Sequence, residues 1–141
     1  MTRYVAGFAF DGKMVALIEK QRPLWQKGLL NGIGGHIEEG EEPIDAMVRE
    51  FREETGVNTM PHEWDRFATL TDGVNFEVTF FKTWCVDIAK LKTKTDEKVV
   101  IFPTEKVNVF NCIPNLTWLI PMAKSMPWDS AWAFTVMEEH A

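Results

Sequence analysis

The chain has few of the residues that build cross-links or transition-metal sites. Its 141 residues include two cysteines and three histidines. Cys85 and Cys112 form no Cys-x-x-Cys pair, and we expect two reduced thiols in the core of a cytoplasmic protein. His36, His62 and His140 are scattered, so no zinc-type cluster is predicted. The local sequence suggests no Ser–His or Cys–His arrangement, which makes covalent catalysis the weaker hypothesis.

Positive charge is also scarce. Lysine and arginine total 15 against 21 aspartates and glutamates, for a net charge of −6. Proteins that bind nucleic-acid polymers usually carry a basic patch, so we expect no such partner. An acidic chain can still take a phosphate substrate if metal ions supply the positive charge. The apolar run within residues 1–12 is short and soon broken, and it predicts neither a signal peptide nor a membrane association.

The remaining composition is typical of a soluble globular protein, with 45% hydrophobic and 26% charged residues. A chain of 141 residues fits one domain with room for a core, and no internal repeat or linker divides it. We therefore expect a single domain over residues 1–141.

Strands, loops and helices are predicted along the chain from local patterns. Residues 3–10 and 13–19 are β-type runs around Asp11-Gly12, which predicts a short hairpin, and residues 20–29 are predicted to form a loop. The aromatic tail, with Trp128, Trp132 and Phe134, is expected to pack back on the domain. Between these regions, residues 62–72 and 75–87 are predicted to be β-rich, and residues 89–96 to form a loop. A further strand is predicted at residues 98–102, and a helix interrupted near Pro121 at Leu116–Ser125.

A helix is predicted from Pro43 to Thr55. The proline suits a first helical turn, where its missing N–H costs nothing, and Gly56 is a typical C-terminal stop. Apolar residues recur at spacings of three and four, which predicts one buried face made of Ile44, Met47, Val48 and Phe51.

Three carboxylates share a neighbouring face of this helix. Glu50, Glu53 and Glu54 stand at i, i+3 and i+4, where like charges destabilise a helix by roughly 0.2–0.5 kcal/mol per pair. A cation would remove this repulsion, and hard oxygen ligands suit Mg²⁺ or Mn²⁺. The alternative is a solvated acidic face, which would be the better interpretation if these five residues, EFREE, stood alone.

The wider spacing favours the metal site. Gly35, five residues, Glu41, seven residues and then the run from Arg49 to Val57 resemble the Nudix box, Gly-x5-Glu-x7-Arg-Glu-U-x-Glu-Glu-x-Gly-U, where U is a bulky aliphatic residue. Phe51 departs from the pattern at one U but stays apolar. The resemblance implies a Nudix fold of the α/β (α+β) class, with a mixed central sheet sandwiched between helices. It also implies metal-dependent hydrolysis of a nucleoside diphosphate linked to another group.

The resemblance assigns roles within the box and just outside it. Either Glu50 or Glu97 would act as general base, with Asp96 as a substitute for the latter. Arg49 would hold the glutamates in place, Glu41 included. The metal ligands would be the Gly34 carbonyl, Glu50, Glu53, Glu54 and Glu97. The box residues with a structural role would be Gly35, Glu41 and Gly56.

Three residues of the predicted loop 20–29 are candidates for substrate contact. Lys20 and Arg22 have the charge to bind phosphates, although loops also carry such charges for solubility. Trp25 has the ring to stack on a nucleobase, at about 1–3 kcal/mol per stacked base. Its alternative role is a loop anchor packed on the core.

Two asparagines are candidates for the base pocket. Asn31-Gly32 before the paired glycines is similar to the Nudix branch that removes oxidised purine nucleoside triphosphates, where this asparagine lines the base pocket; it is alternatively a turn-former. Asn115 matches a position that reads the base edge in MutT-type enzymes, and it is alternatively a helix N-cap. That branch can carry acidic residues where Asn115 and Leu116 are neutral, which weakens an assignment to 8-oxoguanine.

The resulting hypothesis is a MutT-like hydrolase that cuts (deoxy)nucleoside triphosphates to monophosphate and pyrophosphate. A nucleotide sugar or a dinucleoside polyphosphate remains an alternative substrate. A non-catalytic nucleotide-binding module is a further alternative, although such modules usually lose a box glutamate and this chain keeps all of them. The oligomeric state, monomer or homodimer, stays open.

Overall fold

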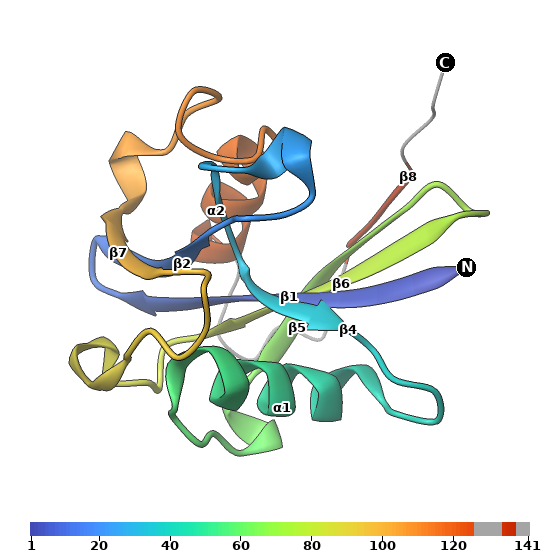
Figure 1. The fold of residues 1–141 in the computed structure, drawn as a ribbon, viewed down its shortest axis with the longest axis horizontal. Helices are drawn as coiled ribbons and strands as arrows, with labels where there is room; N and C mark the ends of the chain where they lie inside the picture. Colours follow the sequence, from blue (N-terminus) through green and yellow to red (C-terminus); the bar gives the residue numbers. More distant parts are fainter. Residues whose placement is uncertain (126–133, 138–141) are drawn as a thin grey trace.

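The computed structural model describes residues 1–125 and 134–137. In these residues eight strands form one sheet in the order β3-β2-β1-β6-β5-β8, with β4 paired to β1 and β7 paired to β2 (Figure 1). The β1–β6 and β5–β8 pairs are parallel and the others antiparallel, so the sheet is mixed as predicted. The strands are β1 Thr2–Asp11, β2 Met14–Glu19, β3 Leu30–Asn31, β4 Ile33–His36, β5 Asp65–Thr71, β6 Phe76–Thr83, β7 Val99–Pro103 and β8 Phe134–Met137. The helices are α1 Pro43–Thr55 and α2 Leu116–Ser125, with short 3₁₀ turns at η1 Leu24–Gln26, η2 Pro61–Glu63, η3 Ile88–Lys90 and η4 Thr104–Lys106.

The predicted hairpin is present between β1 and β2. Asp11 pairs with Met14, so the turn is Gly12-Lys13, one residue later than the sequence predicted. Gly12 adopts a φ of 57°, which glycine reaches without a Cβ penalty. The strand thus keeps Asp11 in its ladder, and the positive φ decides where the chain reverses.

Two hydrophobic cores lie on opposite faces of the sheet because side chains alternate along β1 and β2. Phe8 and Leu17 pack with α2, whereas Ala9 and Ile18 pack with α1. Figure 1 shows the two helices on opposite sides of the sheet. The predicted arrangement, a mixed sheet sandwiched between helices, is therefore confirmed.

Helix α1 lies very close to β1. A Cβ atom on Gly7 would lie 2.6 Å from Cε of Met47 and 2.9 Å from the Trp64 ring, so glycine is needed at the contact. Phe51 lies edge-on to Trp64, with ring centroids 5.1 Å apart. This packing fixes the height of the acidic helix face above the sheet.

The helix ends agree with the sequence at α1 and differ inside α2. Gly56 ends α1 with φ 79° and donates its N–H to the Arg52 carbonyl, as expected of a glycine stop. Helix α2 was expected to break near Pro121, but it runs without interruption through that residue. Leu119 and Ile120 are buried against the sheet, and this packing offsets the hydrogen bond that the proline removes.

One expectation about the core needs correction, and one buried charge was not expected. Cys112 is buried and burial raises the pKa of its thiol, but Cys85 is exposed because it follows the end of β6 in a turn. Conversely, Lys82 on β6 is fully buried and donates its Nζ to the Ala123 carbonyl of α2 at 2.8 Å. Burial lowers the pKa of this lysine, and the charge of Asp65 opposes that shift.

Trp128 and Trp132 lie outside the described residues, whereas Phe134 begins β8, which pairs with β5. Among the described residues, no helix combines the length and the apolar character that crossing a membrane requires.

Candidate active site

Arg49 stands at the centre of the acidic face of α1. Its Nε and Nη2 donate to the two carboxylate oxygens of Glu41, both at 2.9 Å, which is a bidentate pair. Nη1 donates to Glu50 Oε1 at 2.9 Å and more weakly to Glu53 at 3.3 Å. Nη2 also donates to the His36 carbonyl at 2.9 Å, which ties the helix to β4. One arginine thus gathers three carboxylates from two turns of α1 and the loop before it.

The pKa values of two carboxylates that Arg49 holds are shifted in opposite directions. The hydrogen bond from Arg49 lowers the pKa of Glu41, whose side chain is only 16% exposed. Burial instead raises the pKa of Glu50, and the contact with Arg49 opposes this rise only in part. Glu41 is therefore held as an anion that orients the arginine, while Glu50 lies in a less solvated position.

The paired glycines act at two different contacts. A Cβ on Gly34 would lie 1.9 Å from the Val5 carbonyl oxygen, so glycine permits the close approach of β4 to β1. A Cβ on Gly35 would lie 2.7 Å from the carboxyl carbon of Glu50. The bare backbone of β4 is thus the surface on which the Glu50 carboxylate rests.

The strand register directs the Gly34 carbonyl outward. Gly34 lies opposite Ala6 in the antiparallel β1–β4 pair, and the Ile37 N–H donates to the Arg3 carbonyl at 2.9 Å. Because hydrogen-bonded and non-hydrogen-bonded pairs alternate along such a ladder, Gly34 and Ala6 form a non-hydrogen-bonded pair. The Gly34 carbonyl therefore points away from β1 and is available to a ligand.

The end of α1 meets a loop from far along the chain. Thr95 donates its hydroxyl to Glu54 Oε2 at 2.9 Å, and the same hydroxyl accepts the Glu97 N–H at 3.1 Å. Burial raises the pKa of Glu54, and the nearby charge of Glu97 adds to that rise. The predicted box glutamate and the predicted extra carboxylate therefore lie in one electrostatic neighbourhood.

Lys20 and Arg22 of the loop 20–29 are paired with this second loop. Glu97 is 5% exposed, and it accepts the Lys20 Nζ at 3.2 Å and the Gln21 N–H at 2.8 Å. Arg22 and Asp96 form an ion pair at the exposed rim. The two loops are thus joined by two charge pairs, one buried and one in solvent.

The donor chemistry fits a hard divalent cation, although the carboxylates are partnered within the protein. Glu50 and Glu53 contact Arg49, and Glu54 contacts Thr95. Within the described residues, no three histidine, cysteine or acidic side chains already converge as a ready metal site. All candidate ligands are oxygens, which is the set that Mg²⁺ and Mn²⁺ prefer.

The candidate base-pocket residues come from two segments that lie side by side. Leu30, the first residue of β3, donates its N–H to the Asn111 carbonyl and accepts the Ile113 N–H, each at 2.9 Å. This pairing sets the strand that ends at Asn31 beside the segment that leads to Asn115. Asn31 accepts the Gly32 N–H at 2.8 Å, so it also shapes the local backbone.

The alternative roles of Asn115 and Trp25 are wrong. Asn115 Oδ1 is shielded from solvent and has no hydrogen-bond partner in the described residues, so its side chain does not cap α2. Trp25 is 66% exposed and does not anchor its loop in the core. Base contact and stacking remain predictions for these two residues.

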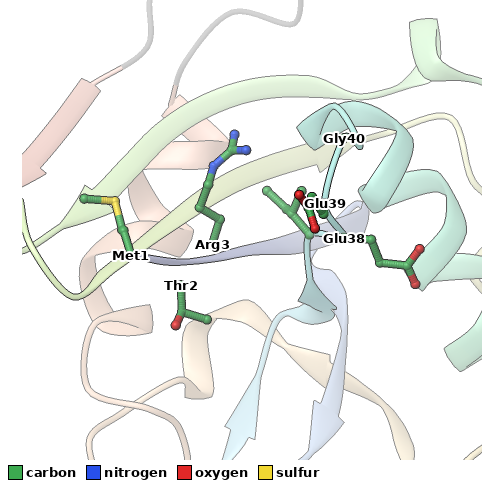
Figure 2. Close-up of a pocket in the computed structure, with 7 residues that line it drawn as sticks. Met1, Thr2, Arg3, Glu38, Glu39 and Gly40 are labelled. Carbon is green, nitrogen blue, oxygen red and sulfur yellow. The ribbon is translucent and has the colours of Figure 1, made fainter.

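A separate open depression of 480 Å³ lies beside the acidic face. Its lining comes from the start of β1 and from the loop before α1 (Figure 2). Glu38, one of the lining residues, has its carboxylate 3.8 Å from Arg49 Nη1. None of the residues predicted to bind metal or substrate lines this depression.

The comparison with protein-family models decides the family. The model described as "NUDIX domain" matches residues 2–128. The chain belongs to the Nudix family. It is accordingly a Nudix hydrolase, in the class of enzymes that act on nucleoside diphosphates linked to another group. A search of curated proteins finds no match.

Solved structures share the Nudix fold at low sequence identity. A Nudix hydrolase from Nitrosomonas europaea superposes with a TM-score of 0.73 at 12% identity, covering 98% of this chain and 79% of that one. A mutator MutT protein from Bacillus halodurans gives 0.71 at 18%, covering 96% and 88%. A MutT studied from Aliivibrio salmonicida and Vibrio cholerae gives 0.69 at 21%, covering 89% and 98%. Identities in this range establish the fold of the Nudix chain and leave its substrate to be argued from the site.

Sequence reasoning identified the carboxylates and missed the groups that join them. Thr95 and the Gln21 N–H carried no signal of their own, because a threonine and a backbone amide have no diagnostic spacing. The charge pairs were signalled only by the presence of cations in one loop and of Asp96 and Glu97 in the other.

Proposed function

We propose that this Nudix hydrolase cuts (deoxy)nucleoside triphosphates to the monophosphate and pyrophosphate with Mg²⁺, and that Mn²⁺ can substitute. The observation that carries the proposal is the pairing of Leu30 with residues 111–113. It brings the strand that ends at Asn31 beside the segment that leads to Asn115, which supports a shared role for these two amide side chains. Amides of this kind can pair with the edges of a purine base. The proposal extends to one domain over residues 1–141 in the cytoplasm, where thiols such as Cys85 stay reduced.

The Nudix box supplies the metal ligands in this proposal. Glu53, Glu54 and the Gly34 carbonyl would hold the cation, with Glu50 and Glu97 beside them. When bound, the metal neutralises phosphate oxygens and lowers the pKa of a coordinated water.

The protein groups around that cation have separate tasks. Arg49 holds Glu41, Glu50 and Glu53 in a fixed pattern through its hydrogen bonds. Lys20 is largely buried and Arg22 is exposed, and the phosphates of a substrate would compete with the carboxylates that these two cations now contact.

We assign the general base to Glu50 ahead of Glu97. Both oxygens of Glu97 already accept hydrogen bonds, from Lys20 and the Gln21 N–H. Glu50 accepts from Arg49 through Oε1, which leaves Oε2 to take a proton from the attacking water.

The test is product release with Mg²⁺ across natural and oxidised nucleoside triphosphates, nucleotide sugars and dinucleoside polyphosphates. We expect monophosphate and pyrophosphate from triphosphates, and we expect chelation to abolish turnover. Turnover confined to a nucleotide sugar or a dinucleoside polyphosphate would contradict the proposed substrate class and leave the proposed metal site standing. A folded protein that binds metal and turns over nothing would contradict the proposal and favour a binding module.

A matched pair of variants tests the metal ligands. Glu53→Gln should remove most metal-dependent turnover and leave the fold intact. Glu38→Gln is the control, because Glu38 is an exposed carboxylate 3.8 Å from the same arginine and has no assigned role at the cation. Equal activity in the two variants would contradict the assignment of Glu53 as a metal ligand.

A further inference from the structure

We propose that Thr95 is a positioning residue that sets the separation of Glu54 and Glu97 before a divalent cation binds. Its hydroxyl donates to Glu54 Oε2 at 2.9 Å and accepts the Glu97 N–H at 3.1 Å. One side-chain oxygen thus contacts both the box carboxylate on α1 and the residue that carries the second carboxylate. The inference rests on the proposed function, because it concerns the same metal site.

The backbone around Thr95 is fixed to the helix end independently of the hydroxyl. The Lys92 N–H donates to the Thr55 carbonyl at 3.0 Å, and the Lys94 N–H donates to the Glu54 carbonyl at 3.2 Å. Thr93, two residues away, accepts the Val99 N–H through its own hydroxyl at 2.9 Å. The loop therefore has its own supports, and the Thr95 hydroxyl is left with an orienting task on the Glu54 carboxylate.

The task matters because the two carboxylates repel each other. Glu97 is held from the opposite side by Lys20 and the Gln21 N–H, so its oxygens have little freedom. Glu54 is held at its carboxylate by Thr95 alone among the hydrogen bonds of the described residues. Without that hydroxyl, only the charge of Lys20 opposes the repulsion of Glu54 from Glu97, and part of the binding free energy of a cation is then used to restore the geometry. Partners of this kind typically change metal affinity by about 10–100-fold.

The experiment measures Mn²⁺ binding to the substrate-free protein, by calorimetry and by the loss of the electron paramagnetic resonance signal of free Mn²⁺. Thr95→Val keeps the shape of the side chain and removes the hydroxyl, and we expect Mn²⁺ affinity to fall by about tenfold or more. Thr95→Ser keeps the hydroxyl and should bind within about threefold of the wild type, because the hydrogen bond to Glu54 is retained.

Thr93→Val is the matched control. It removes a hydroxyl from the same loop, and this hydroxyl contacts neither carboxylate. Mn²⁺ affinity should therefore stay at the wild-type value. A fall in both valine variants would mean that the loop simply loosens, and it would overturn the positioning role. Wild-type affinity in Thr95→Val would overturn it too, as would a Thr95→Ser variant as weak as the valine.

A second variant locates the effect on Glu54. In a Glu54→Gln background, Thr95→Val should add no further loss of affinity, because the hydroxyl acts through that carboxylate. If Thr95→Val lowers Mn²⁺ affinity as much in the Glu54→Gln background as in the wild type, the proposed action of Thr95 through Glu54 is overturned. Failure of the wild type to bind Mn²⁺ at all would instead remove the proposed metal site, so the two failures can be told apart.

Discussion

Gly35 and Glu50 are in direct contact: a Cβ atom on the glycine would lie 2.7 Å from the carboxyl carbon and from one oxygen of the glutamate. The contact joins β4 to the middle of α1 across 15 positions of the chain. Gly35 has no positive φ, so its role here is space and not backbone freedom.

The first prediction follows from this contact. Gly35→Ala should fold normally but push the Glu50 carboxylate away from β4, and turnover should fall by about 10²-fold, the cost of a misplacement near 1 Å. Gly40→Ala is the comparison, because Gly40 has φ 79° and no atom within 4 Å of its Cβ position. That variant should lose stability and keep the chemistry. The check is turnover beside thermal unfolding, and an active Gly35→Ala protein would contradict the role of the contact.

The second prediction concerns the fork of Arg49. Arg49→Lys cannot reproduce the bidentate pair with Glu41 while also reaching Glu50, so we expect the free energy of unfolding to fall by about 1–3 kcal/mol. Urea unfolding measures this. Arg52→Lys, an exposed arginine on the same helix, should change little. Equal effects in the two variants would show that the geometry of the fork is unimportant.

The third prediction separates recognition from structure at two asparagines. Asn115→Ala should change the ranking of bases with little loss of stability, because its Oδ1 has no hydrogen-bond partner in the described residues. Asn111→Ala should lower stability and leave the ranking of bases unchanged, since Asn111 accepts the Asn108 N–H and donates to the Lys106 carbonyl. Kinetics on several triphosphates and thermal melts distinguish the two. An equal loss on every base in Asn115→Ala would argue for a packing role.

The fourth prediction is a pH dependence at the β5–β6 turn. Burial opposes ionisation of Asp72, but bonds from the N–H groups of Val74, Asn75 and Phe76 outweigh it, and the pKa lies well below its ordinary value of 3.8. A lowered pKa means that this carboxylate stabilises the fold above about pH 4 and loses that effect as the pH falls through the folded-state pKa.

Asp72→Asn should therefore be less stable than the wild type at pH 7 and should show a smaller drop in stability on acidification. The measurement is urea unfolding at pH 7 and pH 3. Asp87→Asn is the control, because the Asp87 carboxylate accepts one exposed N–H, from Ala89. A wild-type acid profile in Asp72→Asn would contradict the prediction.

Local patterns predicted both helices and five of the eight described strands of this Nudix chain, but not β3, β4 or β8. The bounds of α1 were predicted from Pro43 and Gly56, because helix ends are set by residues within one turn. The hairpin was placed within one residue for the same reason. Pro121 misled the prediction because a propensity acts locally, and burial of the residues around it was not visible in the sequence.

The sequence alone determined which residues are candidates for the chemistry: a fixed spacing puts Glu50, Glu53 and Glu54 on one helix face, and the box that contains them indicates the family. Tertiary structure decided how those carboxylates are held. The contacts of Glu50 with Gly35, of Glu54 with Thr95 and of Glu97 with Lys20 join segments 15 to 77 residues apart. Such pairs form only when the sheet and the two cores bring distant segments together, and nothing in their local sequence encodes the distance between them.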